Sequence, residues 1–388
     1  MTNLVNPYPD VIEVPGILST HEHPRDTDAE GDGRAELIIP HLARAYEDVI
    51  AMGNTARPLT TPELARAKAK QWRALIPEDK PLRIHVAGLM TEATTPEEVL
   101  AGYNQQDWAA MKMFLRAVSN SGGADVDDVR KIIPALNAMT YGEGIRRPIP
   151  LLIHAERKFD LHGKRIFFLN REKEAMERDV RFMLSEVPGA ALRICHVGDR
   201  HTLDMIEELR RQGYDICAEI SPHYTQYCID DLFEGPDGGT ALNSHLFCMP
   251  FFKTPEDRDA IHGAMVSGKD WLYYGPDNAC HIDNTAKDKG VKVSSLGYTV
   301  GGQTQIPEAT LSYVVEKFVE AGALEHLAGF LSNNGRKALL LPPAQNYATF
   351  TRNEWVVPKY IGRTSPTLGE LRCKVAMGGQ TRQYQIAI

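Results

Sequence analysis

The chain has 388 residues, of which 43% are hydrophobic, and this length fits either two or three domains or one large α/β barrel. The formal net charge is −8, with acidic and basic residues mixed along the chain, so no basic stripe indicates nucleic-acid binding. The first residues lack the regions of a signal peptide, and no apolar run reaches the roughly 20 residues of a membrane span. The six cysteines contain no C-x-x-C pair and are expected to be buried thiols. We therefore expect a cytoplasmic protein that acts on a small molecule, with neither nucleic acid nor membrane as a partner.

Short strand-like runs alternate with helical patterns along most of the chain. This alternation predicts a parallel sheet, and eight such runs favour a closed (β/α)8 TIM barrel of the α/β class. A doubly wound sheet is the alternative, but no glycine-rich phosphate loop follows the first run. The predicted strands are 16–20, 49–52, 82–86, 109–114, 149–153, 192–195, 214–220 and 271–274.

Three of the intervening helices have clear start signals. Thr61, Thr95 and Thr254 are each followed by proline and then by acidic residues. A threonine N-cap, a proline at the first helical position and acids in the first turn are typical of a helix N-terminus. Further helical patterns cover residues 125–140, 171–186, 200–212, 308–321 and 324–331.

The two ends of the chain do not fit the alternating pattern. Some 16 residues precede the first predicted strand, which are too few for an N-terminal sheet domain. The tail has few helical signals but extended runs at 355–360 and 385–388. We expect one barrel domain over residues 1–342 and a C-terminal extension over 343–388 that packs on it.

Histidines mark the end of the first predicted strand. In Thr20-His21-Glu22-His23-Pro24-Arg25-Asp26, His21 and His23 are two residues apart, so a strand places both side chains on one face. Two imidazoles at a barrel mouth can bind one cation, although an H-x-H pattern alone is a weak signal.

Three more candidate ligands follow apolar strands in the same way. His154 and His196 come directly after predicted strands, and Asp277 follows the last one. Each could be explained alone as a buried histidine bonded to the backbone, or as a carboxylate that caps a loop. Their common position at the carboxyl ends of strands, where barrel enzymes build their sites, favours metal ligands.

Lys112 lies inside the apolar run Ala109-Ala110-Met111-Lys112-Met113-Phe114-Leu115. A buried cation is costly unless it is paired, and a lysine with a lowered pKa is a nucleophile. Capture of carbon dioxide would turn it into a carbamate, which could bridge two metals. The alternative is a lysine whose ammonium group reaches the solvent at the rim.

Taken together, these residues resemble the amidohydrolase superfamily and, within it, the short bacterial type of the dihydroorotase family. The resemblance covers about residues 13–340. Besides the ligands it rests on five segments, which are Met52-Gly53-Asn54-Thr55-Ala56-Arg57-Pro58-Leu59-Thr60-Thr61, Leu151-Leu152-Ile153-His154-Ala155-Glu156, Ala218-Glu219-Ile220-Ser221-Pro222-His223, His245-Leu246-Phe247-Cys248-Met249-Pro250-Phe251-Phe252-Lys253 and Gly275-Pro276-Asp277-Asn278-Ala279-Cys280-His281.

The resemblance implies a role for each residue. His21, His23 and Asp277 would bind one divalent metal, His154 and His196 a second, and carbamylated Lys112 would bridge them; zinc is the metal expected. Asp277 would also carry the proton during catalysis. The substrate carboxylate would be bound by Arg25, Asn54 and His281. For Arg25 the alternative is an ion pair with Asp26 or Glu22 only, and Asn54 could simply cap a turn.

The implied reaction is the reversible hydrolysis of dihydroorotate to N-carbamoyl-aspartate in pyrimidine biosynthesis, by a homodimer. Two alternatives remain open. One is a cyclic amidase for another carboxylate-bearing ring, and the other is a catalytically inactive scaffold. The sequence also departs from the family pattern: Cys280 stands where proline is usual, Asn243-Ser244 replaces an Arg-Pro pair, residues 301–307 differ, and an insertion is expected near 159–168.

Overall fold

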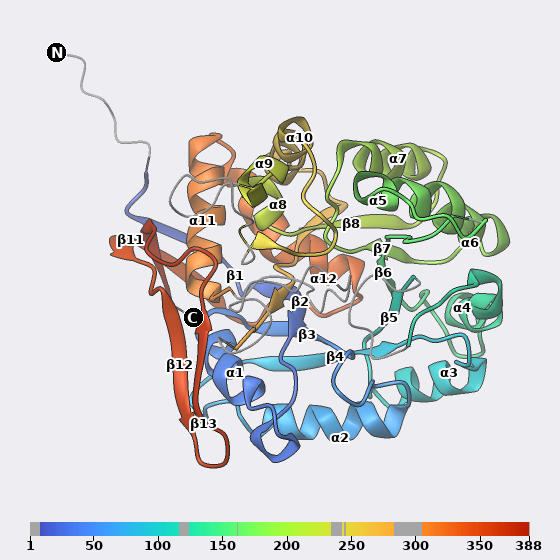
Figure 1. The fold of residues 1–388 in the computed structure, drawn as a ribbon, viewed down its shortest axis with the longest axis horizontal. Coiled ribbons are helices and arrows are strands. Elements are labelled where there is room, and N and C mark those ends of the chain that lie inside the picture. The colour runs from blue at the N-terminus through green and yellow to red at the C-terminus, as the bar shows by residue number, and fades with distance from the viewer. Residues whose placement is uncertain are drawn as a thin grey trace.

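A computed structural model describes residues 8–115, 124–160, 162–233, 243, 246–282 and 305–387 (Figure 1). Its main element is one sheet in which each strand pairs in parallel with the next along the chain. The strands are β2 (Leu18–His23), β3 (Asp48–Met52), β4 (Arg83–Leu89), β5 (Ala110–Phe114), β6 (Leu151–His154), β7 (Leu192–Ile194), β8 (Ile216–Ile220), β9 (Leu272–Tyr274) and β10 (Asn278–Ala279).

The sheet closes at its last two segments. β9 pairs with β8, whereas β10, which begins four residues after β9 ends, pairs with β2 at the other edge. The segment 272–279 therefore joins both edges, and the predicted barrel is confirmed. Each of the eight predicted strands coincides with an observed one to within a few residues at either end.

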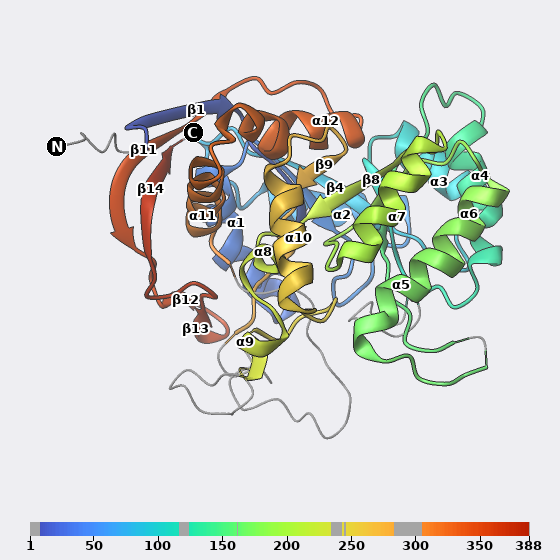
Figure 2. The ribbon, with the colours of Figure 1, turned by 90° about the horizontal axis from the view of Figure 1, so that it is seen from above.

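Helices surround this barrel (Figures 1 and 2). The three Thr-Pro starts are confirmed as the N-caps of α2 (Pro62–Arg73), α3 (Pro96–Asn104) and α10 (Pro255–Val266), with each threonine side chain accepting a backbone N–H bond. α1 (Arg34–Ala45) was not predicted, because it begins after Gly33 and contains Pro40. The others include α4 (Ile133–Tyr141), α5 (Arg171–Ala175), α6 (Arg181–Glu186), α7 (Arg200–Arg211), α8 (His223–Gln226), α9 (Ile229–Phe233), α11 (Pro307–Glu320) and α12 (Asn334–Ala338).

The barrel interior has an apolar layer. Its members are buried side chains from successive strands, closed off by a residue that follows α12: Leu18, Ile50, Met52, Ala87, Ala110, Leu152, Cys195 and Leu339. Because alternate strand residues face the same side, side chains two positions further along point into the barrel above this layer. Lys112 follows Ala110 in this way, and His154 follows Leu152.

A second sheet combines both ends of the described chain. β1 (Val11–Pro15) pairs antiparallel with β11 (Tyr347–Val356), which pairs with β14 (Thr381–Ala387). In Figure 2 this sheet lies on the outer side of α11. β12 (Tyr360–Ser365) and β13 (Gly369–Lys374) form a separate hairpin. The sequence did not predict β1, and the domain boundary at 342/343 stays a prediction. None of the described helices combines the length and apolar character that a bilayer crossing requires.

Candidate metal centre and active site

The first group of candidate ligands lies where β2 meets the segment between β9 and β10. Nε2 of His21 lies 3.2 Å from Nε2 of His23. Oδ1 of Asp277 lies 3.0 Å from the His23 nitrogen and 3.3 Å from the His21 nitrogen. The pairing of β2 with β3 shifts register between Ser19 and Glu22, a bulge of the kind that re-aims side chains near active sites. Three buried ligand atoms therefore converge on one point, as a cation requires.

The second group is a pair of histidines from β6 and β7. Nδ1 of His154 lies 3.0 Å from Nε2 of His196, and both side chains are buried. The other nitrogen of His154, Nε2, is 2.9 Å from Oε2 of Glu156. That contact assigns the hydrogen to Nε2 and leaves Nδ1 available as a metal ligand.

Lys112 lies between these two groups. Its side chain is fully buried, and its Nζ has no hydrogen-bond partner within the described ranges. Its charge acts on both groups. Burial is the first cause that lowers the pKa of His154 and His196, and the lysine lowers both further. At His21, burial and the lysine likewise act to lower the pKa, against the raising effect of Glu219. The alternative in which Lys112 reaches solvent at the rim is wrong.

The backbone is strained at three of these positions. Arg25, His196 and Asp277 have φ angles of 66°, 39° and 49°, a region that residues other than glycine rarely adopt. Such strain costs of order 1–3 kcal/mol per residue and collects at functional sites. At His196 the positive φ angle breaks the alternation of a strand. The adjacent side chains of Cys195 and His196 therefore both face the barrel interior, where Cys195 joins the apolar layer and His196 contacts His154.

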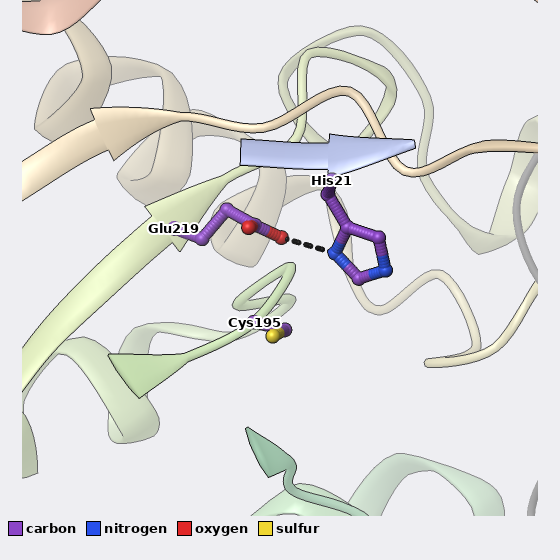
Figure 3. Close-up of side chains that lie close together, drawn as sticks. All are labelled: His21, Cys195 and Glu219. Atoms are coloured by element: carbon purple, nitrogen blue, oxygen red, sulfur yellow. Dashed lines mark hydrogen bonds and ion pairs between the residues drawn. The ribbon is translucent and has the colours of Figure 1, made fainter. Parts of the chain in front are cut away.

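Glu219 supports the first group from β8 (Figure 3). Its Oε1 lies 2.7 Å from Nδ1 of His21 and accepts a 3.0 Å bond from the backbone N–H of His196. The hydroxyl of Thr20 donates to Oε2 at 2.8 Å. Cys195 lies near both His21 and Glu219. A ligand atom from each of these three buried residues could therefore hold a metal ion. We interpret this group instead as support, because the bond from Nδ1–H to Glu219 directs Nε2 of His21 toward Asp277.

Neither Glu219 nor Glu156, the two carboxylates that contact the candidate ligands His21 and His154, was assigned a role from the sequence. Glu219 did carry a signal, since it is a carboxylate inside the apolar run Ile216-Cys217-Ala218-Glu219-Ile220 and must be paired there. Glu156 carried a weaker one, because it lies two residues after His154 in the chain.

Arg25 and Asn54 lie beside the first group. Oδ1 of Asn54 is 2.8 Å from Nδ1 of His23, so Asn54 orients this ring rather than merely capping a turn. The buried guanidinium of Arg25 donates from Nη1 to the backbone oxygen of Asn54 at 2.9 Å. Burial is the main cause that lowers the pKa of Arg25 to about 10, and nearby Arg34 adds to it.

The carboxylates next to Arg25 in sequence are bonded to other groups. Asp26 accepts from Nζ of Lys68 at 2.7 Å, and Glu22 accepts from Ser19 and Asn278. Within the described ranges Arg25 has no ion pair, so the alternative in which it pairs only with Asp26 or Glu22 is not what the structure has. A buried cation without a counterion is ready to bind an anion.

His281 follows β10, whose two residues pair with Glu22 and His23, and it is 9% exposed. This places it at the same end of the barrel as the two ligand groups. Of the departures from the family pattern, Ser244 and residues 301–304 lie outside the described residues. In the segment where an insertion is expected, Phe159 and Arg165 form an antiparallel bridge.

Comparison with known proteins finds dihydroorotases among the similar sequences, although no family model matches the chain. The dihydroorotase of Cupriavidus necator is 28% identical over 358 residues, which cover 91% of this chain and 94% of that protein. The dihydroorotase of Teredinibacter turnerae is 27% identical over 92% of this chain and 94% of its own length. The chain is a relative of the dihydroorotases.

Solved structures give the same fold. The crystal structure of dihydroorotase from Saccharomyces cerevisiae in complex with 5-fluoroorotic acid superimposes with a TM-score of 0.81 at 21% identity, over 97% of this chain and 98% of that one. L-hydantoinase from Arthrobacter aurescens gives a TM-score of 0.75 at 18% identity, but only 82% of its chain is covered. The coverage is thus more complete for the dihydroorotase than for this hydantoinase.

Proposed function

We propose that this chain is a metal-dependent dihydroorotase, a cyclic amide hydrolase that interconverts dihydroorotate and N-carbamoyl-aspartate in pyrimidine biosynthesis. The observation that carries the proposal is the meeting of two ligand groups with a buried lysine between them and an arginine without a counterion beside them. The relatives named dihydroorotase support it over about nine-tenths of the chain.

The donor set fits two divalent ions. His21, His23 and Asp277 would hold one, and His154 and His196 the other, with Lys112 bridging them as a carbamate. Nζ of Lys112 is buried without a hydrogen-bond partner in the described part of the chain, and a carbamate bonded to metals would remove that cost. Imidazole and carboxylate ligands suit zinc. When bound, the two ions supply an activated water and polarise the ring carbonyl.

Asp277 is the proton carrier in this proposal. Burial raises the pKa of its carboxyl, but His21 and His23 outweigh burial and hold the pKa well below its usual range. Asp277 is therefore ionised at neutral pH and can accept the proton of the attacking water. It then delivers this proton to the ring nitrogen that leaves as the amide opens. In the biosynthetic direction the same residue takes the proton from that nitrogen.

The ring carboxylate is bound by Arg25, Asn54 and His281. A guanidinium offers two parallel N–H donors to one carboxylate, which fixes the orientation of the ring. Asn54 uses its Oδ1 on His23, so its amide N–H₂ group is the part that can donate to the substrate. These contacts select a ring that carries a carboxylate.

Steady-state turnover of dihydroorotate, hydantoin, dihydrouracil and allantoin by metal-loaded protein tests the proposal. Dihydroorotate should be turned over with the highest kcat/KM, and the purified protein should hold two metal ions per chain. A preference for a different carboxylate-bearing ring would replace the proposal with another cyclic amidase. Protein that binds no metal and turns over none of the four would be an inactive scaffold.

We further propose a cytoplasmic homodimer as the working form. The relatives support an enzyme that acts on a small molecule. Sedimentation analysis of the purified chain tests the dimer.

A further inference from the structure

Two cysteines from distant parts of the chain meet beside the candidate active site. Sγ of Cys280 lies 2.7 Å from Sγ of Cys373, across 93 positions of sequence, and both side chains are fully buried. Cys280 directly follows β10 and precedes His281. Cys373 lies in β13 of the small hairpin. Neither cysteine is among the candidate metal ligands or the candidate substrate-binding residues.

The backbone around the two sulfurs holds them in place. Ile282, two residues after Cys280, forms an antiparallel bridge with Cys373 itself. Nη1 of Arg34, at the start of α1, donates to the carbonyl oxygen of Cys280 at 3.3 Å. Arg363 of β12 donates to Asp28 at 3.0 Å. The hairpin β12–β13 thus rests on both the loop of His281 and the segment before α1, next to which Figure 1 shows it.

We propose that Cys280 and Cys373 form a reversible disulfide when the protein meets a peroxide. One thiolate attacks a peroxide oxygen, which breaks the O–O bond and gives a sulfenic acid and one water. The second thiol attacks that sulfur, forms the S–S bond and releases the second water. The two sulfurs lose two electrons and hydrogen peroxide gains them. A dithiol or excess thiol returns both cysteines to the reduced state.

The position of the hairpin explains how buried sulfurs meet a small oxidant. β12 and β13 form a two-stranded sheet of their own, and the bridge between Ile282 and Cys373 ties it to the loop of His281. A two-stranded hairpin is marginally stable by itself. Segments of this kind open locally far more often than a barrel core unfolds. Opening of the hairpin exposes both sulfurs, and reclosing brings them together again. The disulfide then holds the closed arrangement that the structure shows.

The crosslink also bears on the substrate, and this part rests on the proposed function. It fixes the backbone beside His281 in the conformation that the structure describes. Pre-ordering one binding side chain removes about 0.5–1.5 kcal/mol of ordering cost, which is roughly twofold to tenfold in affinity. We therefore expect KM for dihydroorotate to fall by about that factor on oxidation while kcat stays.

The test treats the full-length, metal-loaded protein with hydrogen peroxide, alkylates the remaining thiols, and then denatures and digests it without reductant. We expect one linked peptide pair that joins residues 280 and 373, a loss of two hydrogen masses, and full reversal by dithiothreitol. Cys280→Ser and Cys373→Ser should each abolish the linked pair. Cys228→Ser removes a buried thiol elsewhere and serves as the matched control, which should still form it.

Thermal unfolding gives a second readout that is independent of activity. A crosslink between residues so far apart in sequence constrains the unfolded chain, so oxidised protein should melt several degrees above reduced protein. This gain should be absent in Cys373→Ser. If 280 and 373 are alkylated separately, or are oxidised singly, at peroxide levels that consume other thiols, the disulfide is refuted. An unchanged KM in crosslinked protein refutes only the link to the substrate. Reduced protein that fails to turn over dihydroorotate refutes the proposed function and leaves the crosslink result standing.

Discussion

Replacement of Arg25 by methionine is the sharpest test of substrate recognition. The Arg25 guanidinium is buried and its Nη1 bonds to the backbone oxygen of Asn54. Within the described ranges it has no carboxylate partner, because Asp26 is bonded to Lys68. Methionine keeps much of the apolar volume and removes the charge. In the described structure the substitution therefore breaks no ion pair, and we expect the variant to fold.

The expected loss follows from one charge-assisted contact. Such a hydrogen bond contributes about 1.5–3 kcal/mol, and each 1.36 kcal/mol is about tenfold in rate. Arg25→Met should thus lower kcat/KM for dihydroorotate by roughly tenfold to somewhat over a hundredfold. Arg25→Lys should recover only part of it, because an ammonium cannot form the two parallel bonds of a guanidinium.

The assay compares dihydroorotate with dihydrouracil, which has the same kind of ring without the carboxylate. Dihydrouracil should be a poor substrate of the wild type and little affected by Arg25→Met, while the metal content stays at two per chain. Equal turnover of the two substrates by the wild type would refute carboxylate recognition. A loss of metal in the variant would show instead that Arg25 supports the ligand groups.

Four further predictions concern other residues. Lys112→Ala should abolish activity, and short carboxylic acids should partly restore it if they replace the carbamate; wild-type crystals that show an unmodified lysine pointing to solvent would contradict this. Asp277→Asn should keep the fold and much of the metal but lose most turnover, because an amide cannot carry the proton; a near-normal rate would exclude that role. Glu219→Gln should weaken metal binding, by about tenfold to a hundredfold in a chelator competition, since the amide no longer fixes the charge-assisted bond to His21; unchanged affinity would make Glu219 purely structural. Asp48→Asn should destabilise the fold by about 3 kcal/mol at neutral pH. Burial raises the pKa of Asp48, but His85 and Arg83 hold it well below its usual value. Its contribution is therefore fully present above the unfolded pKa of about 3.9 and is lost progressively as the pH falls from there toward the lower folded pKa, so the difference in Tm between Asp48→Asn and wild type should shrink steadily below about pH 4.

The barrel could be predicted because its signals are local. Each strand is a short apolar run, and three helices begin with Thr-Pro, whose cap bonds need only residues within one turn. The polar residues at the strand ends could be found for the same reason. Once eight parallel strands are assumed, their carboxyl ends must meet, and His21, His154 and Asp277 must approach each other.

What could not be predicted depends on pairing between distant residues. β1 is a strand because β11 lies beside it, more than 330 positions later in the chain. α1 forms despite Pro40, since its apolar face packs into the core. The contact between Cys280 and Cys373 requires the position of the hairpin β12–β13, which neither local sequence contains.

For Lys112 and Glu219 the sequence predicts that each charge needs a partner, but it does not predict what that partner is. Both are charged residues in the middle of apolar strands, and both must therefore be compensated inside the barrel. The sequence indicates this need equally for the two. The compensation differs: Glu219 is bonded to His21, Thr20 and the backbone of His196, whereas Nζ of Lys112 has no hydrogen bond from the described protein. A charge that the protein itself satisfies acts as support, and a charge that it leaves unsatisfied requires a group from outside the chain. On this basis we propose that Lys112 would bind the metals through its carbamate, and that Glu219 would hold His21 in the orientation of a metal ligand.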